Sequence, residues 1–113
     1  MTTLSDEQIY QTLTQIADQY GLLECQACAE AICAWVKQHN IMAIHLRIRA
    51  RYTDFISSKR VGGHLSITFN GIHYGTEVRN KVFDNLPNTG MTRQNWLDDF
   101  ESVGGFDVEI YDC

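Results

Sequence analysis

The sequence contains little proline, no long apolar run and few positive charges. The last two of these shortages each exclude a class of protein. Its 113 residues include a single proline, and no apolar stretch approaches the roughly 20 residues that cross a membrane. Nine Lys and Arg residues against 14 Asp and Glu residues give a net charge of −5, which argues against a nucleic-acid partner. No heptad run indicates a coiled coil, and an apolar share of 44% excludes a disordered chain. We expect one soluble globular domain over residues 1–113 and no membrane partner.

The charged residues are unevenly distributed along the chain. Six basic residues and one acidic residue lie between Lys37 and Arg60, whereas the segment from Asp98 to Asp112 holds six acidic residues and no basic one. This pattern predicts a domain with a basic face and an acidic face. The alternative is that the asymmetry steers a charged partner.

Two helices are predicted in the first third of the chain. Ser5 and Gln8 form a capping-box signature, and apolar residues then recur at helical spacing until Gly21, which predicts an amphipathic helix over 5–20. The segment 25–39 is apolar over most of its circumference, which is typical of a central helix packed on more than one side.

Strands are predicted after the second helix, where apolar and polar residues alternate. The expected strands cover residues 44–49, 65–69, 72–78, 82–84 and 106–111. The dipeptide Asn70-Gly71 predicts a hairpin between the second and third of these strands. The segment 50–63 has no period and is predicted as a loop.

A short helix is predicted before the last strand. Thr92 is its expected N-cap, Trp96 and Phe100 are expected as core residues without a chemical role, and Gly104 closes it. The predicted fold class is therefore α+β, with N-terminal helices packed on a mostly antiparallel sheet.

Three residues in a particular order point to a thiol nucleophile. Cys25 lies where the second predicted helix begins, His73 lies just after the predicted hairpin turn, and Asp84 follows 11 residues later. A helix N-terminus carries about half a positive charge and favours a thiolate, and a nearby imidazolium lowers the thiol pKa further. A carboxylate on the far ring nitrogen orients the imidazole. We predict Cys25 as the nucleophile, His73 as the general base and acid, and Asp84 as the residue that orients His73.

Cys28 is the alternative nucleophile, because residues three apart project from one face of a helix. Cys25 is favoured, since the helix dipole fades within the first turn. The backbone N–H of Cys25 is the predicted oxyanion donor, because a helix start leaves it without an intrahelical acceptor.

Structural and metal-binding roles are also open to the cysteines. Cys33 is predicted as a core residue and Cys113 as a terminal residue without a role, since three cysteines within nine residues do not suggest a disulfide framework in a reducing cytosol. Cys25, Cys28 and His73 could ligate a metal, but a structural zinc needs a fourth ligand that no second C-x-x-C supplies, so we expect no metal. Taken singly, a cysteine on an Ala-rich helix is more often a core residue. The catalytic prediction depends on the joint occurrence.

Four segments also carry a resemblance to a known family. Residues 25–32 (CQACAEAI), 70–74 (NGIHY), 82–87 (VFDNLP) and 90–100 (GMTRQNWLDDF) are similar to the second, short group of papain-fold toxin domains, which is common in cyanobacteria and other bacteria. The similarity covers residues 22–101. The order Cys, His, Asp matches that of papain-like enzymes.

The resemblance implies a papain-like minimal core and a cysteine-dependent acyl-transfer enzyme, a peptidase or a glutamine deamidase, that acts as a toxin effector. It implies a protein substrate, an immunity or inhibitor protein as a candidate partner, and no cofactor. Because it lies six residues before Cys25, Gln19 resembles the oxyanion-hole glutamine of papain-like proteases.

A non-catalytic binding or regulatory module with the same fold is the alternative function. The basic strand that carries Arg47, Arg49 and Arg51 is its candidate docking surface. The first residues lack the basic and apolar segments of a classical export signal, so we expect a cytoplasmic chain that reaches a target cell by a non-classical route if it is delivered.

Overall fold

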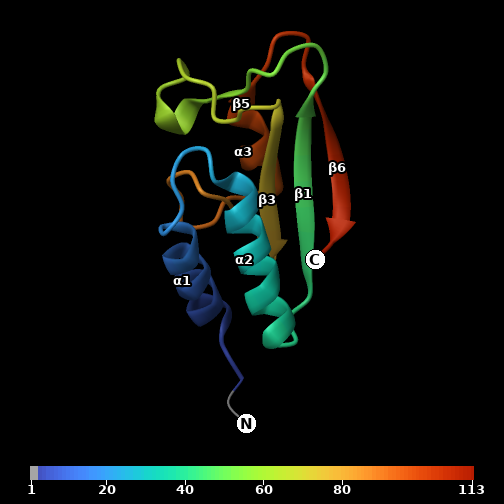
Figure 1. The fold of residues 1–113 in the computed structure, drawn as a ribbon. Helices are drawn as coiled ribbons and strands as arrows, with labels where there is room; N and C mark the ends of the chain where they lie inside the picture. Colours follow the sequence, from blue (N-terminus) through green and yellow to red (C-terminus); the bar gives the residue numbers. More distant parts are fainter. Residues whose placement is uncertain (1–2) are drawn as a thin grey trace.

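The structure, a computed structural model, describes residues 3–113 and places two helices ahead of an antiparallel sheet (Figure 1). The helices are α1 (Asp6–Ala17), α2 (Cys25–Gln38), the 3₁₀ turn η1 (Lys59–Val61) and α3 (Arg93–Asp98). The strands are β1 (Ala43–Ala50), β2 (Ser57–Ser58), β3 (Ile72–Val78), β4 (Lys81–Phe83), β5 (Phe100–Glu101) and β6 (Phe106–Asp112). The predicted α+β class is confirmed.

Both N-terminal helices begin where the sequence predicts. The Ser5 hydroxyl accepts the N–H of Gln8 at 3.2 Å, and the Gln8 side chain accepts the N–H of Ser5 at 2.9 Å, which completes the capping box. The apolar face of α1 packs on α2, where Ile9, Leu13 and Ile32 are buried in one cluster. The first helix is thus amphipathic and the second is central, as predicted.

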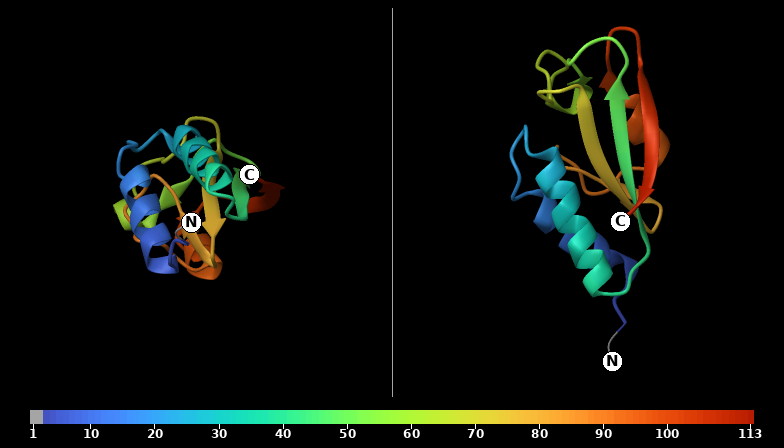
Figure 2. Two further views of the ribbon diagram at one scale, coloured as in Figure 1. Left: turned by 90° about the horizontal axis from the view of Figure 1, so that it is seen from below. Right: turned by 45° about the vertical axis from the view of Figure 1, so that its right-hand side comes forward.

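The larger sheet has the strand order β4-β3-β1-β6, and all neighbouring strands are antiparallel. Helix α2 covers one face of this sheet and α3 lies on the opposite face (Figures 1 and 2). A second apolar cluster on the α3 side contains Leu46 and Ile48 of β1 together with Trp96. Among the described residues β4 pairs only with 76–78, so the first half of β3 has no strand neighbour on that side.

The predicted strand at 65–69 and its hairpin are wrong. Strand β3 pairs with β1 along its whole length instead. The side chains of Thr68 and Asn70 accept the N–H of Ile72 at 3.3 and 3.2 Å, so local side-chain hydrogen bonds take the place of a strand ladder. The turn ends at Gly71, whose φ of +75° is one that glycine adopts without strain.

Two further element boundaries differ from the predictions. The segment 50–63, predicted as a loop, contains β2 and η1, and β2 pairs with β5 in a second sheet of two strands. The helix predicted to run towards Gly104 ends at Asp98, because β5 begins at Phe100. Strands of two residues are too short to leave a periodic pattern in the sequence.

The charged strands do not form separate basic and acidic faces. The basic strand β1 lies directly beside the acidic strand β6. Arg47 pairs with Glu109 at 2.7 Å, and Arg51 pairs with Asp107 at 2.8 Å. The prediction of two faces is wrong because residues about 60 positions apart in the sequence neutralise each other across the sheet. Arg49 also lies 3.4 Å from Glu109, so all three arginines of the candidate docking surface are paired with acidic residues of β6.

A disulfide links Cys33 of α2 with Cys113 after β6. The prediction that Cys33 is only a core residue and that Cys113 has no role is therefore wrong. The two residues are 80 positions apart, and their juxtaposition depends on the β1–β6 pairing. Cys25 and Cys28 remain as free thiols.

Within residues 3–113, no helix combines the length and the apolar character that crossing a membrane requires.

The close packing of Gly75 of β3 against Trp96 yields a first prediction. A Cβ atom at position 75 would lie 2.7 Å from Cζ2 of Trp96 and 2.9 Å from Cγ1 of Val82. We expect Gly75→Ala to lower the free energy of unfolding by about 1–3 kcal/mol, because overpacking a dense core forces its neighbours to move. Urea unfolding measures this change.

Gly21→Ala is the matched control, since its added Cβ would meet only the flexible carboxylate of Glu24 at 3.1 Å. Its expected cost is within about 0.5 kcal/mol. Equal stabilities for the two variants would contradict the packing described here.

Candidate active site

Cys25 is the first residue of α2 and lies against the unpaired edge of β3. Its side chain is largely buried, with 6% of the residue exposed, and its Sγ is 3.8 Å from the carbonyl oxygen of Ile72. The thiol therefore reaches the sheet at the place where β4 is too short to cover β3.

His73 of β3 is fully buried and is held on three sides. Its ring packs against Phe100 at a centroid distance of 5.0 Å and against Trp96 at 6.0 Å. Its Nε2 lies 2.9 Å from Oδ2 of Asp84. Its Nδ1 makes no hydrogen bond of ordinary geometry among the described residues. Because Asp84 occupies Nε2, Nδ1 is the ring nitrogen that is left for an interaction with Cys25.

Asp84 follows β4 and is buried, yet its carboxylate is fully hydrogen-bonded. Besides His73 it accepts the indole N–H of Trp96 at 2.8 Å and two N–H groups of Arg60, each at 2.8 Å. The Nδ2 of Asn88 and the N–H of Leu86 bind Oδ1 at 2.8 and 3.1 Å. A buried carboxylate is tolerated only with such partners.

The electrostatics of the three groups favour a charged thiol and imidazole. Burial raises the pKa of Cys25, but its interactions with His73 and with the backbone N–H groups of Tyr74 and Gln26 together lower the pKa below its ordinary value. Burial lowers the pKa of His73, but Asp84 and Cys25 together raise it. Burial also raises the pKa of the Asp84 carboxyl, and the hydrogen bonds and charges of His73 and Arg60 hold it well below its usual range. These shifts widen the pH range over which thiolate and imidazolium coexist.

One known protein family matches most of the chain. The family described as papain fold toxin 2 matches residues 8–101 of the chain. The chain belongs to this family. No curated protein and no solved structure matches it.

Cys28 differs sharply from Cys25 within this papain-fold toxin domain. It is completely buried in the cluster between α1, α2 and the sheet. Burial, with smaller effects from the charges of Asp84 and Cys25, raises its pKa to about 12. Cys28 therefore stays a neutral thiol that packs behind Cys25, which favours Cys25 as the reactive thiol.

Gln19 lies in the turn after α1 and is exposed, and it makes no hydrogen bond to the residues of the site within the described chain. Asn85, and not Gln19, connects the loop between α1 and α2 with the site. Its Nδ2 donates to the carbonyl oxygens of Gly21 and Leu22 at 2.7 and 3.0 Å. The residue after Asp84 thus fixes the loop that leads into Cys25.

Trp96 and Arg60 are two of the residues that bind Asp84 without having been predicted in this role from the sequence. Trp96 was expected as a core residue, and it is fully buried, but its indole N–H also binds the carboxylate. Arg60 lies in a segment without periodicity, where the sequence shows it only as one of several basic residues. No local signal pairs Arg60 with Asp84, which lies 24 positions away.

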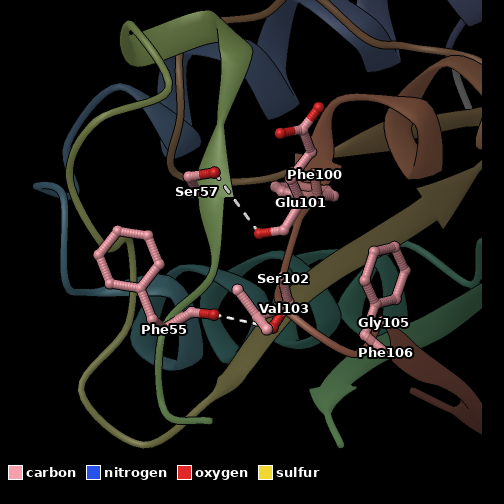
Figure 3. A pocket seen from close by; sticks show the side chains of 8 residues that line it. All are labelled: Phe55, Ser57, Phe100, Glu101, Ser102, Val103, Gly105 and Phe106. Atoms are coloured by element: carbon pink, nitrogen blue, oxygen red, sulfur yellow. Dashed lines mark hydrogen bonds between the residues drawn. The ribbon is translucent and has the colours of Figure 1, made fainter. Parts of the chain in front are cut away.

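A pocket of about 480 Å³ lies next to the site, between the β2–β5 pair and the start of β6 (Figure 3). Phe55 and Val103 flank it, and hydrogen bonds from Ser57 to the Glu101 carbonyl and from Ser102 to the Phe55 carbonyl tie its walls together. Phe100 lines this pocket and also packs on His73. Cys25, His73 and Asp84 do not line the pocket.

The contrast between the two free thiols yields a prediction for native alkylation. With limiting iodoacetamide near neutral pH, we expect Cys25 to react at least roughly tenfold faster than Cys28, since only its pKa is lowered. Peptide mapping by mass spectrometry measures the modified fraction at each thiol.

Cys28→Ser should leave this labelling in place, whereas Cys25→Ser should remove it. The rate at Cys25 should rise with pH at lower values than for a free cysteine, because its pKa lies below the ordinary value of a thiol. Faster labelling of Cys28 would show that the wrong thiol has been assigned.

Proposed function

We propose that this papain-fold toxin domain is a cysteine-dependent acyl-transfer enzyme, a peptidase or a glutamine deamidase, that acts on a protein substrate. The observation that carries the proposal is the buried hydrogen bond of 2.9 Å between His73 and Asp84, beside a free thiol at a helix start. A nucleophile, a base and a group that orients the base are the parts that such a reaction requires.

In the first half of the reaction, the Cys25 thiolate attacks the carbonyl carbon of an amide and forms a carbon–sulfur bond. The N–H of Cys25, at the first turn of α2, is a donor for the oxyanion that develops. The imidazolium of His73 then gives its Nδ1 proton to the leaving nitrogen as the carbon–nitrogen bond breaks. The products are a thioester on Cys25 and an amine, or ammonia if the amide is a glutamine side chain.

In the second half, water attacks the thioester and the carbon–sulfur bond breaks. His73, now neutral, accepts the proton of this water at Nδ1 and forms the imidazolium–thiolate pair again. Asp84 stays ionised throughout and keeps Nε2 in place, which is the role its multiple donors support.

Membership of a toxin family supports a role as an effector on a target. The substrate is then a protein of that target, and the producing cell needs an immunity or inhibitor protein to survive active enzyme. Delivery by a non-classical route belongs to the same proposal.

Acylation by p-nitrophenyl acetate tests the reaction without knowledge of the substrate. We expect nitrophenol release, with a transient acetyl group on Cys25 that intact-mass and peptide analysis detect. His73→Ala should slow acylation by roughly 10²-fold or more, and Asp84→Asn should also slow it, since general-base catalysis has this magnitude.

Cys28→Ser is the matched control and should acylate as the wild type does. Acylation that is unchanged in Cys25→Ser, or in His73→Ala, would refute the proposed chemistry. With a target-cell lysate as substrate, new protein amino termini would indicate a peptidase, and release of ammonia from glutamine would indicate a deamidase.

A further inference from the structure

Arg60 of η1 connects the candidate active site to the smaller sheet. It is 13% exposed at its side chain, and its guanidinium binds two carboxylates at once. Nη1 and Nη2 donate to the two oxygens of Asp84, each at 2.8 Å, and Nε donates to Oδ2 of Asp99 at 2.8 Å. The guanidinium carbon also lies 5.6 Å from the centre of the Phe100 ring, which packs on His73.

The two-point contact fixes the orientation of the Asp84 carboxylate. A guanidinium that binds both oxygens of a carboxylate holds it in one plane, which a single hydrogen bond would not do. In this plane Oδ2 also accepts from Nε2 of His73 and from the indole of Trp96.

Arg60 is itself held by the elements around it. Its backbone N–H donates to Oδ1 of Asp99 at 3.1 Å, and the Ser58 hydroxyl binds the other oxygen of Asp99. Ser58 ends β2, which pairs with β5 directly after Asp99. Asp99 therefore holds Arg60 through its backbone N–H and its Nε, while Nη1 and Nη2 bind Asp84.

We propose that Arg60 is a positioning residue for the acyl-transfer reaction, and that its guanidinium holds Asp84 in the orientation that keeps His73 directed at Cys25. This inference rests on the proposed function. Arg60 acts through Asp84 and has no direct part in the proton transfers between the thiol and the imidazole.

The charge of Arg60 gives this role a signature that a purely structural contact would lack. The titratable and charged groups that meet here are Cys25 and Cys28 from α2, His73 from β3, Asp84 after β4, and Asp99 after α3. Loss of a neighbouring positive charge favours protonation of nearby groups and so raises their pKa values. Loss of a negative charge acts in the opposite direction.

The test compares Arg60→Met, which removes the charge, with Arg60→Lys, which keeps the charge but loses the two-point contact with Asp84. The pH profile of Cys25 alkylation by iodoacetamide is measured for both, together with the rate of acylation by p-nitrophenyl acetate. For Arg60→Met we expect the alkylation profile to move up by roughly one pH unit and acylation to fall by at least roughly tenfold.

For Arg60→Lys we expect an alkylation profile within a few tenths of a unit of the wild type, but slower acylation, since lysine cannot bind a carboxylate at two points. An unchanged acylation rate in a folded Arg60→Lys variant would overturn the proposal. This variant decides the question if Arg60→Met does not fold, because it retains the charge that compensates the two buried carboxylates.

Asp99→Asn is the matched control for the contact that holds Arg60 in the fold, its hydrogen bonds to Asp99. It weakens the anchor behind Arg60 and removes a negative charge, so any change in the alkylation profile should be a small shift to lower pH. If Arg60→Met and Asp99→Asn shifted the profile in the same direction and by the same amount, Arg60 would only tie η1 to the rest of the fold, and the proposal would be wrong.

The outcomes separate failure of this inference from failure of the proposed function. A wild-type protein that alkylates at Cys25 but never acylates would refute the acyl-transfer function. The alkylation profile of Arg60→Met, compared with that of the wild type, would still show whether the charge of Arg60 acts on the thiol and the imidazole.

Discussion

The buried carboxylate of Asp84 is the group on which the arrangement of this site depends. Removing a carboxylate from water costs several kcal/mol unless it is paired and hydrogen-bonded, and here its donors come from four parts of the chain. The imidazole belongs to β3, Arg60 to η1, the Trp96 indole to α3, and the remaining donors to the turn after β4. Moving any of these elements away would deprive a buried charge of part of its hydrogen bonds. The orientation of His73 therefore follows from the way in which the fold provides hydrogen bonds to the Asp84 carboxylate.

The position of the thiol follows from a second constraint, the incomplete sheet edge. Strand β4 covers only the end of β3, and α2 begins beside the part that β4 leaves open. Cys25 can therefore approach the imidazole of a strand residue from the edge of the sheet. The loop before Cys25 is fixed in turn by Asn85, the neighbour of Asp84 in the sequence. One short segment after β4 thus positions both the His73 ring and the loop that leads into Cys25.

The parts of this fold that the sequence predicts are those with local signals. The capping box at Ser5, the cap at Thr92 and the helix start at Cys25 depend on residues within one or two turns of one another. Arg60 could not be assigned in this way, because its carboxylate partner is remote in the sequence and its segment has no period. The Cys33–Cys113 disulfide and the ion pairs between β1 and β6 could not be predicted for the same reason, since their partners are also remote in the sequence. The wrongly predicted hairpin shows that a local signal can also mislead. At Asn70-Gly71 the chain forms side-chain hydrogen bonds, and β3 pairs with β1 instead of with a strand before the turn.

The protonation of the His73 ring tests most directly whether Asp84 fixes the ring through Nε2 and leaves Nδ1 for Cys25. Nitrogen NMR of the protein labelled with ¹⁵N-histidine, with His73 assigned by substitution, reports the state of each ring nitrogen as a function of pH. We expect Nε2 to carry a proton at every pH at which the protein is folded, and titration to occur at Nδ1 and to respond to Cys25→Ser. A neutral His73 with its proton on Nδ1 and none on Nε2 would contradict this role of Asp84.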